Sequence, residues 1–207
     1  MEPFIRLTAV AAPLDLANVD TDRILPARFL RKPRSGGYGG FLFHDLRLTP
    51  GGAERPDFVL NLAAYREARI LVAVENFGCG SSREGAVWAL LDRGFRAVIA
   101  PSFGDIFRGN CFNNGILPVV LPGERVAALQ EALHASPGAR MTIDLDSQIV
   151  VGPDGAQDRF AVDPFRKECL LRGRDEIALT LEHEAAIAAY ESRRRTEFPW
   201  LAEWPPP

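Results

Sequence analysis

The segment ENFGCGSSREGAVWAL, residues 75–90, sets the expected fold of the chain. It directly follows the apolar run ILVAV at residues 70–74, which is typical of a strand buried on both faces. Two glycines, a cysteine and two serines come next, and then Ala86, Leu90 and Leu91 recur at helical spacing. The pattern predicts a buried strand that turns directly into a helix.

The same alternation continues along the chain. AVIAPSF at residues 97–103 and ILPVVL at residues 116–121 are further apolar runs of strand length, and helical patterns separate them. Three buried strands with interposed helices predict an α/β core. We also expect a first strand at 4–15, a helix at 124–135, hairpin strands at 140–152 and 159–163, a helix from 163 that contains Cys169, and a long amphipathic helix at 176–195.

Two segments near the start are irregular. NVDTDRILPARFL, residues 18–30, is interpreted as a turn-rich entry to a second extended segment. RKPRSGGYGG, residues 31–40, combines a proline with four glycines and predicts a mobile loop. Such loops often close over ligands.

The size and composition predict a single soluble globular domain. The 207 residues allow a single domain, 1–207, with a core at about 4–181 and a C-terminal helix and tail at about 175–207. With 47% hydrophobic residues, 25% charged residues and a net charge of -3, nothing favours nucleic acid or an anionic membrane. No secretory signal pattern or apolar run of about 18 residues is present, so we expect a cytoplasmic protein.

The cysteines do not form a recognisable metal or disulfide pattern. Cys79, Cys111 and Cys169 are an odd number and are far apart in the sequence. We therefore expect this chain to bind no metal and no cofactor. Cys111 and Cys169 are expected to be buried small side chains.

Residues 78–84 do not match the known glycine-rich motifs for nucleotide binding or for a catalytic serine. A dinucleotide fingerprint requires a glycine where the chain has Arg83, and a phosphate-binding P-loop requires a lysine that this segment lacks. A nucleophile elbow would make Ser82 the nucleophile, but Glu84 replaces its last glycine and a triad would need one of the three histidines.

Two interpretations of the serines remain. In the first, backbone N–H groups at the helix start, Ser81, Ser82 and Arg83 converge on an anion such as a carboxylate. The positive field would also lower the cost of ionising a serine, which could then act as a base. In the second, the two serines only cap the helix.

These residues also resemble a known family. ENFGCGSSREGAVWAL is similar to the motif of the small subunits of 3-isopropylmalate dehydratase, which are related to the swivelling fourth domain of aconitase. NVDTDRILPARFL, VIAPSFGDIFRGNCFNNGILPV and DPFRKECLLRGRDEIALTL resemble the family in the same order, so the likeness covers most of residues 18–181. It implies an α/β fold: a single swivelling β/β/α domain with C-terminal helices.

The resemblance implies a function shared with a second chain. A separate large subunit would carry a [4Fe-4S] cluster, and the pair would interconvert 2-isopropylmalate and 3-isopropylmalate in leucine biosynthesis. Ser81 would be the catalytic base with Arg83 as its catalytic partner. Ser82, Thr21 and Asp22 would bind the dicarboxylate substrate.

In the family, substrate discrimination is attributed to the loop represented here by residues 31–40. An arginine of this region is expected to bind a substrate carboxylate. We assign Arg31, with Arg28 and Arg34 as rivals.

One position departs from the family pattern. The usual Glu-His-Ala is here Glu84-Gly85-Ala86, so an imidazole is missing. The alternatives are a related hydro-lyase for citraconate, methylmalate or homoaconitate, or a dicarboxylate-binding module without catalysis. Asn113-Asn114-Gly115 predicts a turn with left-handed residues. Trp88 is expected to be a core side chain. The C-terminal segment with Trp200, Trp204 and the final prolines is expected to be a tail or a docking strip.

Overall fold

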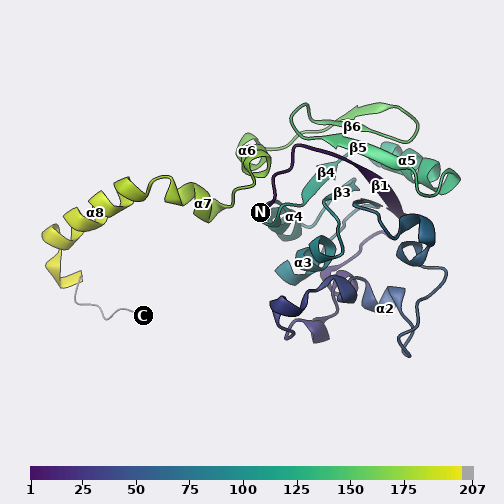
Figure 1. Ribbon diagram of the computed structural model, residues 1–207, viewed down its shortest axis with the longest axis horizontal. Coiled ribbons are helices and arrows are strands. Elements are labelled where there is room, and N and C mark those ends of the chain that lie inside the picture. Colours follow the sequence, from purple (N-terminus) through teal and green to yellow (C-terminus); the bar gives the residue numbers. More distant parts are fainter. Residues whose placement is uncertain (202–207) are drawn as a thin grey trace. The chain divides into compact units, whose positions relative to one another are not determined.

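The structure is a computed structural model that describes residues 1–201 (Figure 1). Contacts within the chain define two compact units. The first is Met1–Gly173, and the second begins at Arg174. Every predicted site residue lies in the first unit. Trp204 and the final prolines lie outside the described residues.

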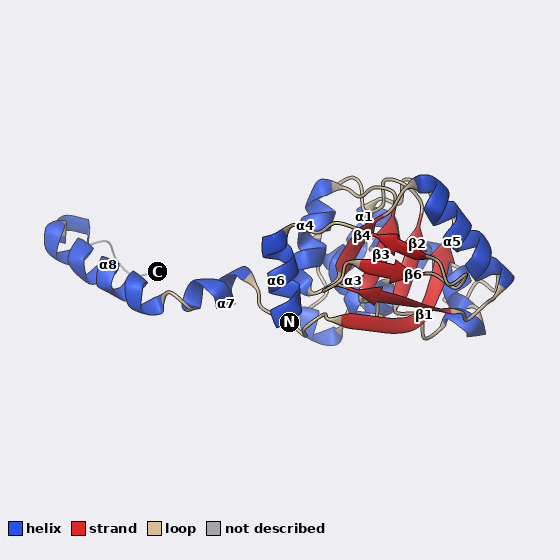
Figure 2. Ribbon diagram, turned by 90° about the horizontal axis from the view of Figure 1, so that it is seen from above, coloured by secondary structure: helices blue, strands red, loops and turns tan. Residues whose placement is uncertain are grey.

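The first unit contains a mixed sheet with strand order β4-β3-β2-β1-β5-β6-β7 (Figure 2). β1 to β4 are mutually parallel, whereas β5, β6 and β7 continue from β1 as antiparallel neighbours. The strands are β1 (Arg6–Leu14), β2 (Ile70–Ala73), β3 (Ala97–Ala100), β4 (Leu117–Val120), β5 (Arg140–Asp144), β6 (Ile149–Val151) and β7 (Gln157–Arg159).

Helices connect the parallel strands and extend the chain at its end. They are α1 (Thr21–Ile24), α2 (His44–Arg47), α3 (Glu84–Asp92), α4 (Asp105–Asn114), α5 (Gly123–Ala135), α6 (Pro164–Arg172), α7 (Glu176–Leu181) and α8 (Glu184–Glu197). No helix within residues 1–201 is both long enough and apolar enough to cross a membrane.

Both faces of the parallel strands are buried. Along β2, Leu71 and Ala73 pack into one hydrophobic cluster with α3, while Ile70 and Val72 pack into a second cluster with α5. α3 and α5 accordingly lie on opposite sides of the sheet (Figure 1). This explains why β2 has a continuous apolar sequence rather than an alternating one. The predicted α/β core is confirmed.

Residues 18–30 are turn-rich, as predicted, but they do not lead into an extended segment. The chain forms α1 and then the 3-10 turn Ala27–Phe29. The Asp20 side chain accepts a hydrogen bond from the backbone N–H of Arg23 (2.7 Å), and Asp22 accepts one from Ala27 (3.2 Å). These aspartates satisfy free N–H groups of short helical turns, so the chain turns instead of extending.

The long helix expected at 176–195 is divided. α7 ends at Leu181 and α8 starts at Glu184, with His183 between them at φ -101° and ψ 14°. Arg174, just before α7, forms an ion pair with Glu182. No proline or glycine marks this break in the sequence.

The three thiols differ in exposure. Cys111 is 0% exposed and Cys169 is 5% exposed, whereas Cys79 is only half-buried. Burial raises the pKa of the Cys111 thiol above its usual range. The expected burial of Cys111 and Cys169 is confirmed.

This difference leads to a labelling prediction for the isolated native chain. Because the thiolate is the reactive form, an aromatic disulfide reagent should modify Cys79 rapidly and the other two cysteines only after denaturation. Absorbance of the released thiolate counts the reacting groups. A Cys79→Ser variant should lose the fast phase, and rapid labelling of that variant would contradict the burial described here.

Candidate functional site

The candidate site forms where loops follow the carboxyl ends of β1, β2 and β3. The first two loops pair through their backbones: Asn18 N–H donates to Glu75 (3.0 Å), Gly78 N–H to Val19 (2.7 Å) and Thr21 N–H to Cys79 (3.0 Å). Carboxyl ends of parallel strands meet at one edge of a sheet, which is where open α/β sheets bind ligands. Residues 18–22 and 75–83 therefore meet although they are far apart in sequence.

Two glycines bring the second and third loops into contact. A Cβ atom at Gly78 would lie 2.2 Å from the Phe107 ring, and its φ of +73° also disfavours other residues. A Cβ atom at Gly104 would lie 2.5 Å from the carbonyl oxygen of Gly78. The backbones can approach this closely only because both positions lack a side chain.

A cavity of about 270 Å³ opens between these two loops. Ser81 lies on one wall, and the first turn of α4 forms the other. The residues that line it are Gly78, Gly80, Ser81, Gly104, Asp105, Ile106 and Phe107. Ser81 thus borders an open space.

The hydroxyl groups of Ser81 and Ser82 are exposed and have no hydrogen-bond partner within residues 1–201. The N-cap of α3 is Arg83, and no side chain caps this helix. The interpretation that the two serines only cap the helix is therefore wrong. Their hydroxyls remain available to a ligand.

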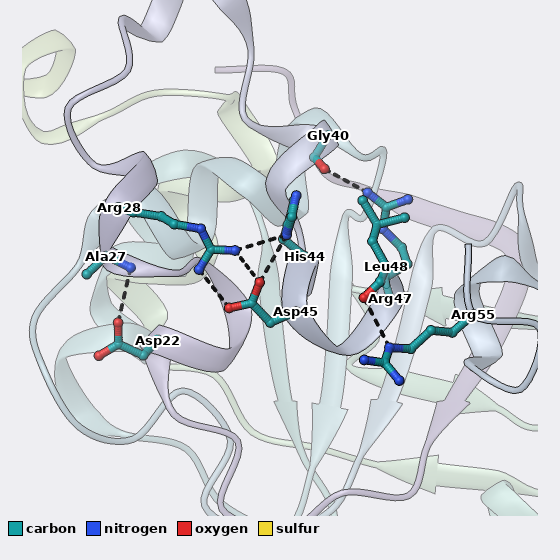
Figure 3. Close-up of polar contacts among 9 residues, drawn as sticks. All are labelled: Asp22, Ala27, Arg28, Gly40, His44, Asp45, Arg47, Leu48 and Arg55. Carbon is teal, nitrogen blue, oxygen red and sulfur yellow. Dashed lines mark hydrogen bonds and ion pairs between the residues drawn. The ribbon is translucent and has the colours of Figure 1, made fainter. Parts of the chain in front are cut away.

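Arg83 is held beside the serines. Its guanidinium forms an ion pair with Asp22, and the two side chains are 17% and 52% exposed. The hydrogen bond from Arg83 lowers the pKa of Asp22, an effect that outweighs the opposing desolvation. Asp22 also accepts the Ala27 N–H group (Figure 3), which fixes its position on α1.

Thr21 is next to this ion pair but is buried, with 2% exposure. Its hydroxyl donates to the carbonyl oxygen of Ser81 at 2.9 Å. The side chain therefore faces the backbone of the serine loop and ties α1 to it.

The three candidate arginines have different environments. Arg28 forms an ion pair with Asp45 and also contacts His44 Nδ1 at 3.1 Å (Figure 3). The Arg28 hydrogen bond is the main cause that lowers the pKa of Asp45 to about 2. Arg34 pairs with Asp92. Arg31 is exposed and has no ion-pair or hydrogen-bond partner within the described chain, so its guanidinium is the one of the three that is free.

The loop that carries Arg31 has local secondary structure. Residues Arg34–Gly36 and Gly39–Phe41 form 3-10 turns. At the end of the loop, the buried Arg47 donates to the carbonyl oxygens of Gly40 (2.7 Å) and Leu42 (3.2 Å), the first of which is drawn in Figure 3. The segment therefore contains short helical turns, and its mobility stays a prediction.

Gly85 lies where this loop packs on α3. An added Cβ atom would be 2.8 Å from Leu25, 3.5 Å from Leu30 and 3.5 Å from the Tyr38 ring. The missing side chain at Gly85 therefore leaves space that these three residues fill.

A Gly85→His variant should be less stable than the wild type. The imidazole would enter a filled region, and overpacking of this kind costs roughly 1–3 kcal/mol of unfolding free energy. Denaturant unfolding of the isolated chain measures the loss. Gly51→His is a suitable control because Gly51 is exposed and has only an ordinary contact at 3.9 Å. Equal stability of the two variants would show that the loop repacks freely.

Asn114 contacts the first helix residue after the serine motif, a contact that the sequence did not predict. Its amide donates to Glu84 (2.8 Å), and its oxygen accepts the Trp88 indole N–H (3.1 Å). Trp88 is partly buried against the core as expected. Asn114 is the last residue of α4, and of the predicted turn with left-handed residues Gly115 alone is left-handed (φ 82°). A spacing of 30 residues gives no local signal for the contact with Glu84.

The described residues do not offer a ligand set for a metal. Among residues 1–201, no group of three or more His, Cys, Asp or Glu side chains is arranged to hold a metal ion. We therefore assign no residue of this chain to an iron–sulfur cluster.

The fold and the loops at its strand ends define a class of protein. Residues 1–124 match the family model described as the aconitase C-terminal domain. Residues 127–164 match a model described as LeuD_N, and residues 176–203 match the model for the C-terminal domain of the 3-isopropylmalate dehydratase small subunit.

Individual relatives agree with these models. A 3-isopropylmalate dehydratase small subunit of Rhodospirillum centenum is 58% identical over 200 residues, which cover 97% of this chain and 98% of the relative. The corresponding protein of Paramagnetospirillum magneticum is 56% identical and covers 97% and 100%. A crystal structure of 3-isopropylmalate dehydratase (leuD) from Methanocaldococcus jannaschii superimposes with a TM-score of 0.65 at 25% identity, covering 90% of this chain and 99% of the other. The chain belongs to the family of 3-isopropylmalate dehydratase small subunits.

Proposed function

We propose that this chain is the small subunit of a 3-isopropylmalate dehydratase. With a large subunit it would interconvert 2-isopropylmalate and 3-isopropylmalate by dehydration and rehydration, as a hydro-lyase of leucine biosynthesis. One observation carries the proposal: two exposed serine hydroxyls without internal partners in the described chain lie beside Arg83 at the start of α3, and Ser81 borders a cavity.

Ser81 is the proposed base. Its Oγ would remove the proton from the substrate carbon during dehydration and return it during rehydration. The Arg83 guanidinium and the N-terminal end of α3 favour negative charge here, so they lower the cost of ionising the hydroxyl. Thr21 holds the Ser81 carbonyl at 2.9 Å, and we assign it the positioning of Ser81.

Hydrogen-bond donors near Ser81 would bind the two carboxylates of the substrate. Arg83 and the Ser82 hydroxyl would bind one carboxylate, with Asp22 holding the guanidinium in place. Arg31 would bind the other, because it is exposed and its guanidinium has no ion-pair or hydrogen-bond partner within the described chain. Leu30, the neighbour of Arg31, packs against Gly85, which brings this part of the loop to the first turn of α3.

The cofactor and compartment complete the proposal. The [4Fe-4S] cluster would be carried by the large subunit, where it would supply Lewis-acid chemistry at the substrate hydroxyl. We also propose a cytoplasmic location, because Cys79, Cys111 and Cys169 form no disulfide bonds with one another.

Gly85 supports a second candidate, a related hydro-lyase with a methylmalate, citraconate or homoaconitate substrate. The side chain missing at this position changes the packing beneath Leu30 and Tyr38, next to the loop that carries Arg31. A change in this loop would alter the space for the substrate's side chain.

The decisive experiment combines the purified chain with a large subunit whose cluster has been reconstituted. Ultraviolet absorbance of the alkene intermediate reports turnover, and 2-isopropylmalate is compared with 2-methylmalate and homocitrate. The proposal expects the highest kcat/KM for 2-isopropylmalate. Preference for another acid would support the second candidate, whereas dicarboxylate binding without turnover would support a non-catalytic module.

A further inference from the structure

The last residue of α3 holds the loop that carries Arg31. The Asp92 carboxylate accepts hydrogen bonds from the Arg34 guanidinium (2.7 Å from Nη2 to Oδ1) and from the Tyr38 backbone N–H (2.6 Å). Partial burial raises the pKa of Asp92, but the bonds from Arg34 and Tyr38 outweigh it, so the net pKa lies below its usual value. A Cβ atom at Gly39 would lie 2.7 Å from the Asp92 carbonyl oxygen, which shows how closely the loop approaches the helix end.

Trp88 extends this contact by one turn of α3. Residues four apart share one face of a helix, so Trp88 and Asp92 form a continuous platform. Over it lie the Arg34 guanidinium, 5.3 Å from the Trp88 ring centre, and the Tyr38 ring, 5.6 Å away and edge-on. Tyr38 is 2% exposed, and its hydroxyl donates to the Lys32 carbonyl oxygen at 2.7 Å.

The other end of α3, its N-terminus, directly follows the proposed catalytic residues. Ser81, Ser82 and Arg83 directly precede α3, and Gly85 in its first turn contacts Leu30 and Tyr38. α3 therefore supports both the proposed base and the loop of the free Arg31. The relative position of these two groups depends on the contact between Asp92 and the loop.

We infer that Asp92 is a positioning residue for substrate selection, which rests on the proposed function. It holds residues 30–38 on α3 and thereby fixes Arg31 relative to Ser81 and Arg83. Loss of the charged contact leaves the base in place but lets Arg31 move, so carboxylate binding and discrimination between substrate side chains decline.

Asp92→Asn tests this role because asparagine keeps the shape of the side chain and an acceptor for Tyr38 N–H. In the complex with the large subunit, KM for 2-isopropylmalate should rise by up to about tenfold, because the free energy of the hydrogen bond lost within the chain limits the binding free energy that a released loop can lose. kcat should stay near the wild-type value, and the preference for 2-isopropylmalate over 2-methylmalate should decrease. Hydrogen exchange of a peptide covering residues 31–41 should accelerate in the isolated chain.

Asp154→Asn is the matched control. Asp154 also accepts hydrogen bonds from an arginine, Arg125 (2.6 Å), and from a backbone N–H, that of Ala156 (3.1 Å), but it lies in the turn between β6 and β7. This variant should keep the wild-type KM, the substrate preference and the exchange of residues 31–41. If Asp92→Asn does not fold, Tyr38→Phe, which removes the hydroxyl that donates to the carbonyl oxygens of Lys32 (2.7 Å) and Leu30 (3.5 Å), should change KM and preference in the same direction.

The possible results separate this inference from the proposed function. An active wild-type complex whose Asp92→Asn form has unchanged KM and substrate preference would overturn the role of Asp92 alone. Faster exchange with unchanged preference would likewise overturn it, because the loop would then move without consequence. A wild-type complex without turnover would overturn the proposed function, and the inference with it.

Discussion

Ser81→Ala should reduce turnover by the complex with the large subunit by about 10²- to 10⁴-fold, the usual contribution of a general base. The variant removes one hydroxyl that is exposed, borders the cavity and has no hydrogen-bond partner within residues 1–201. Because no internal contact is lost, the stability of the chain should not change. The loss should therefore appear in kcat, as measured by alkene absorbance, with little change in the melting temperature.

Two other serines serve as comparisons. Ser136→Ala removes an exposed hydroxyl at the end of α5, on the opposite side of the sheet, and should leave activity unchanged. Ser82→Ala should raise KM more than it lowers kcat, since we assign Ser82 to substrate binding. Full turnover by Ser81→Ala would exclude Ser81 as the base.

Arg83→Lys should lower kcat/KM on the order of 10²-fold, because lysine cannot hold a carboxylate through two parallel hydrogen bonds. The change also weakens the ion pair with Asp22, because it removes the guanidinium. That carboxyl is 52% exposed, so the pair is screened by solvent and its loss should cost about 1 kcal/mol of unfolding free energy or less. Kinetics and denaturant unfolding together separate the two effects.

The pH dependence of this ion pair has a definite sign. Arg83 lowers the pKa of Asp22, so the pair stabilises the fold above the usual carboxyl pKa and loses this contribution as the pH falls through the lowered value. Near neutral pH Asp22 is ionised with or without Arg83, and the kinetic loss is therefore not a protonation effect. Arg69→Lys, an exposed arginine at the amino end of β2, should be neutral. An Arg83→Lys complex with wild-type kcat/KM would exclude the carboxylate clamp.

The features that could be predicted from the sequence are those encoded in contiguous residues. β2 is apolar without interruption because both of its faces are covered, and this pattern directly predicts a central parallel strand. The serines and Arg83 lie together in one segment between β2 and α3, so their proximity required no knowledge of tertiary structure.

Other features depend on contacts between distant residues. Asp92 meets Arg34 across 58 positions and Asn114 meets Glu84 across 30, and neither pair has a local pattern that reveals it. The contacts of the glycine-rich loop with α3 likewise leave no local pattern in the sequence. The capping role of Asp20 was a local signal, and it was missed because the surrounding residues suggested an extended segment.

The absent side chain at Gly85 also constrains how the protein can evolve. Leu25, Leu30 and Tyr38 now fill the volume that a larger residue would need. A histidine here would have to displace the tip of the buried Leu25 side chain, which is the one contact shorter than 3 Å, so a smaller residue at position 25 would ease its introduction. Substitution at position 85 is in this sense coupled to the residue at position 25.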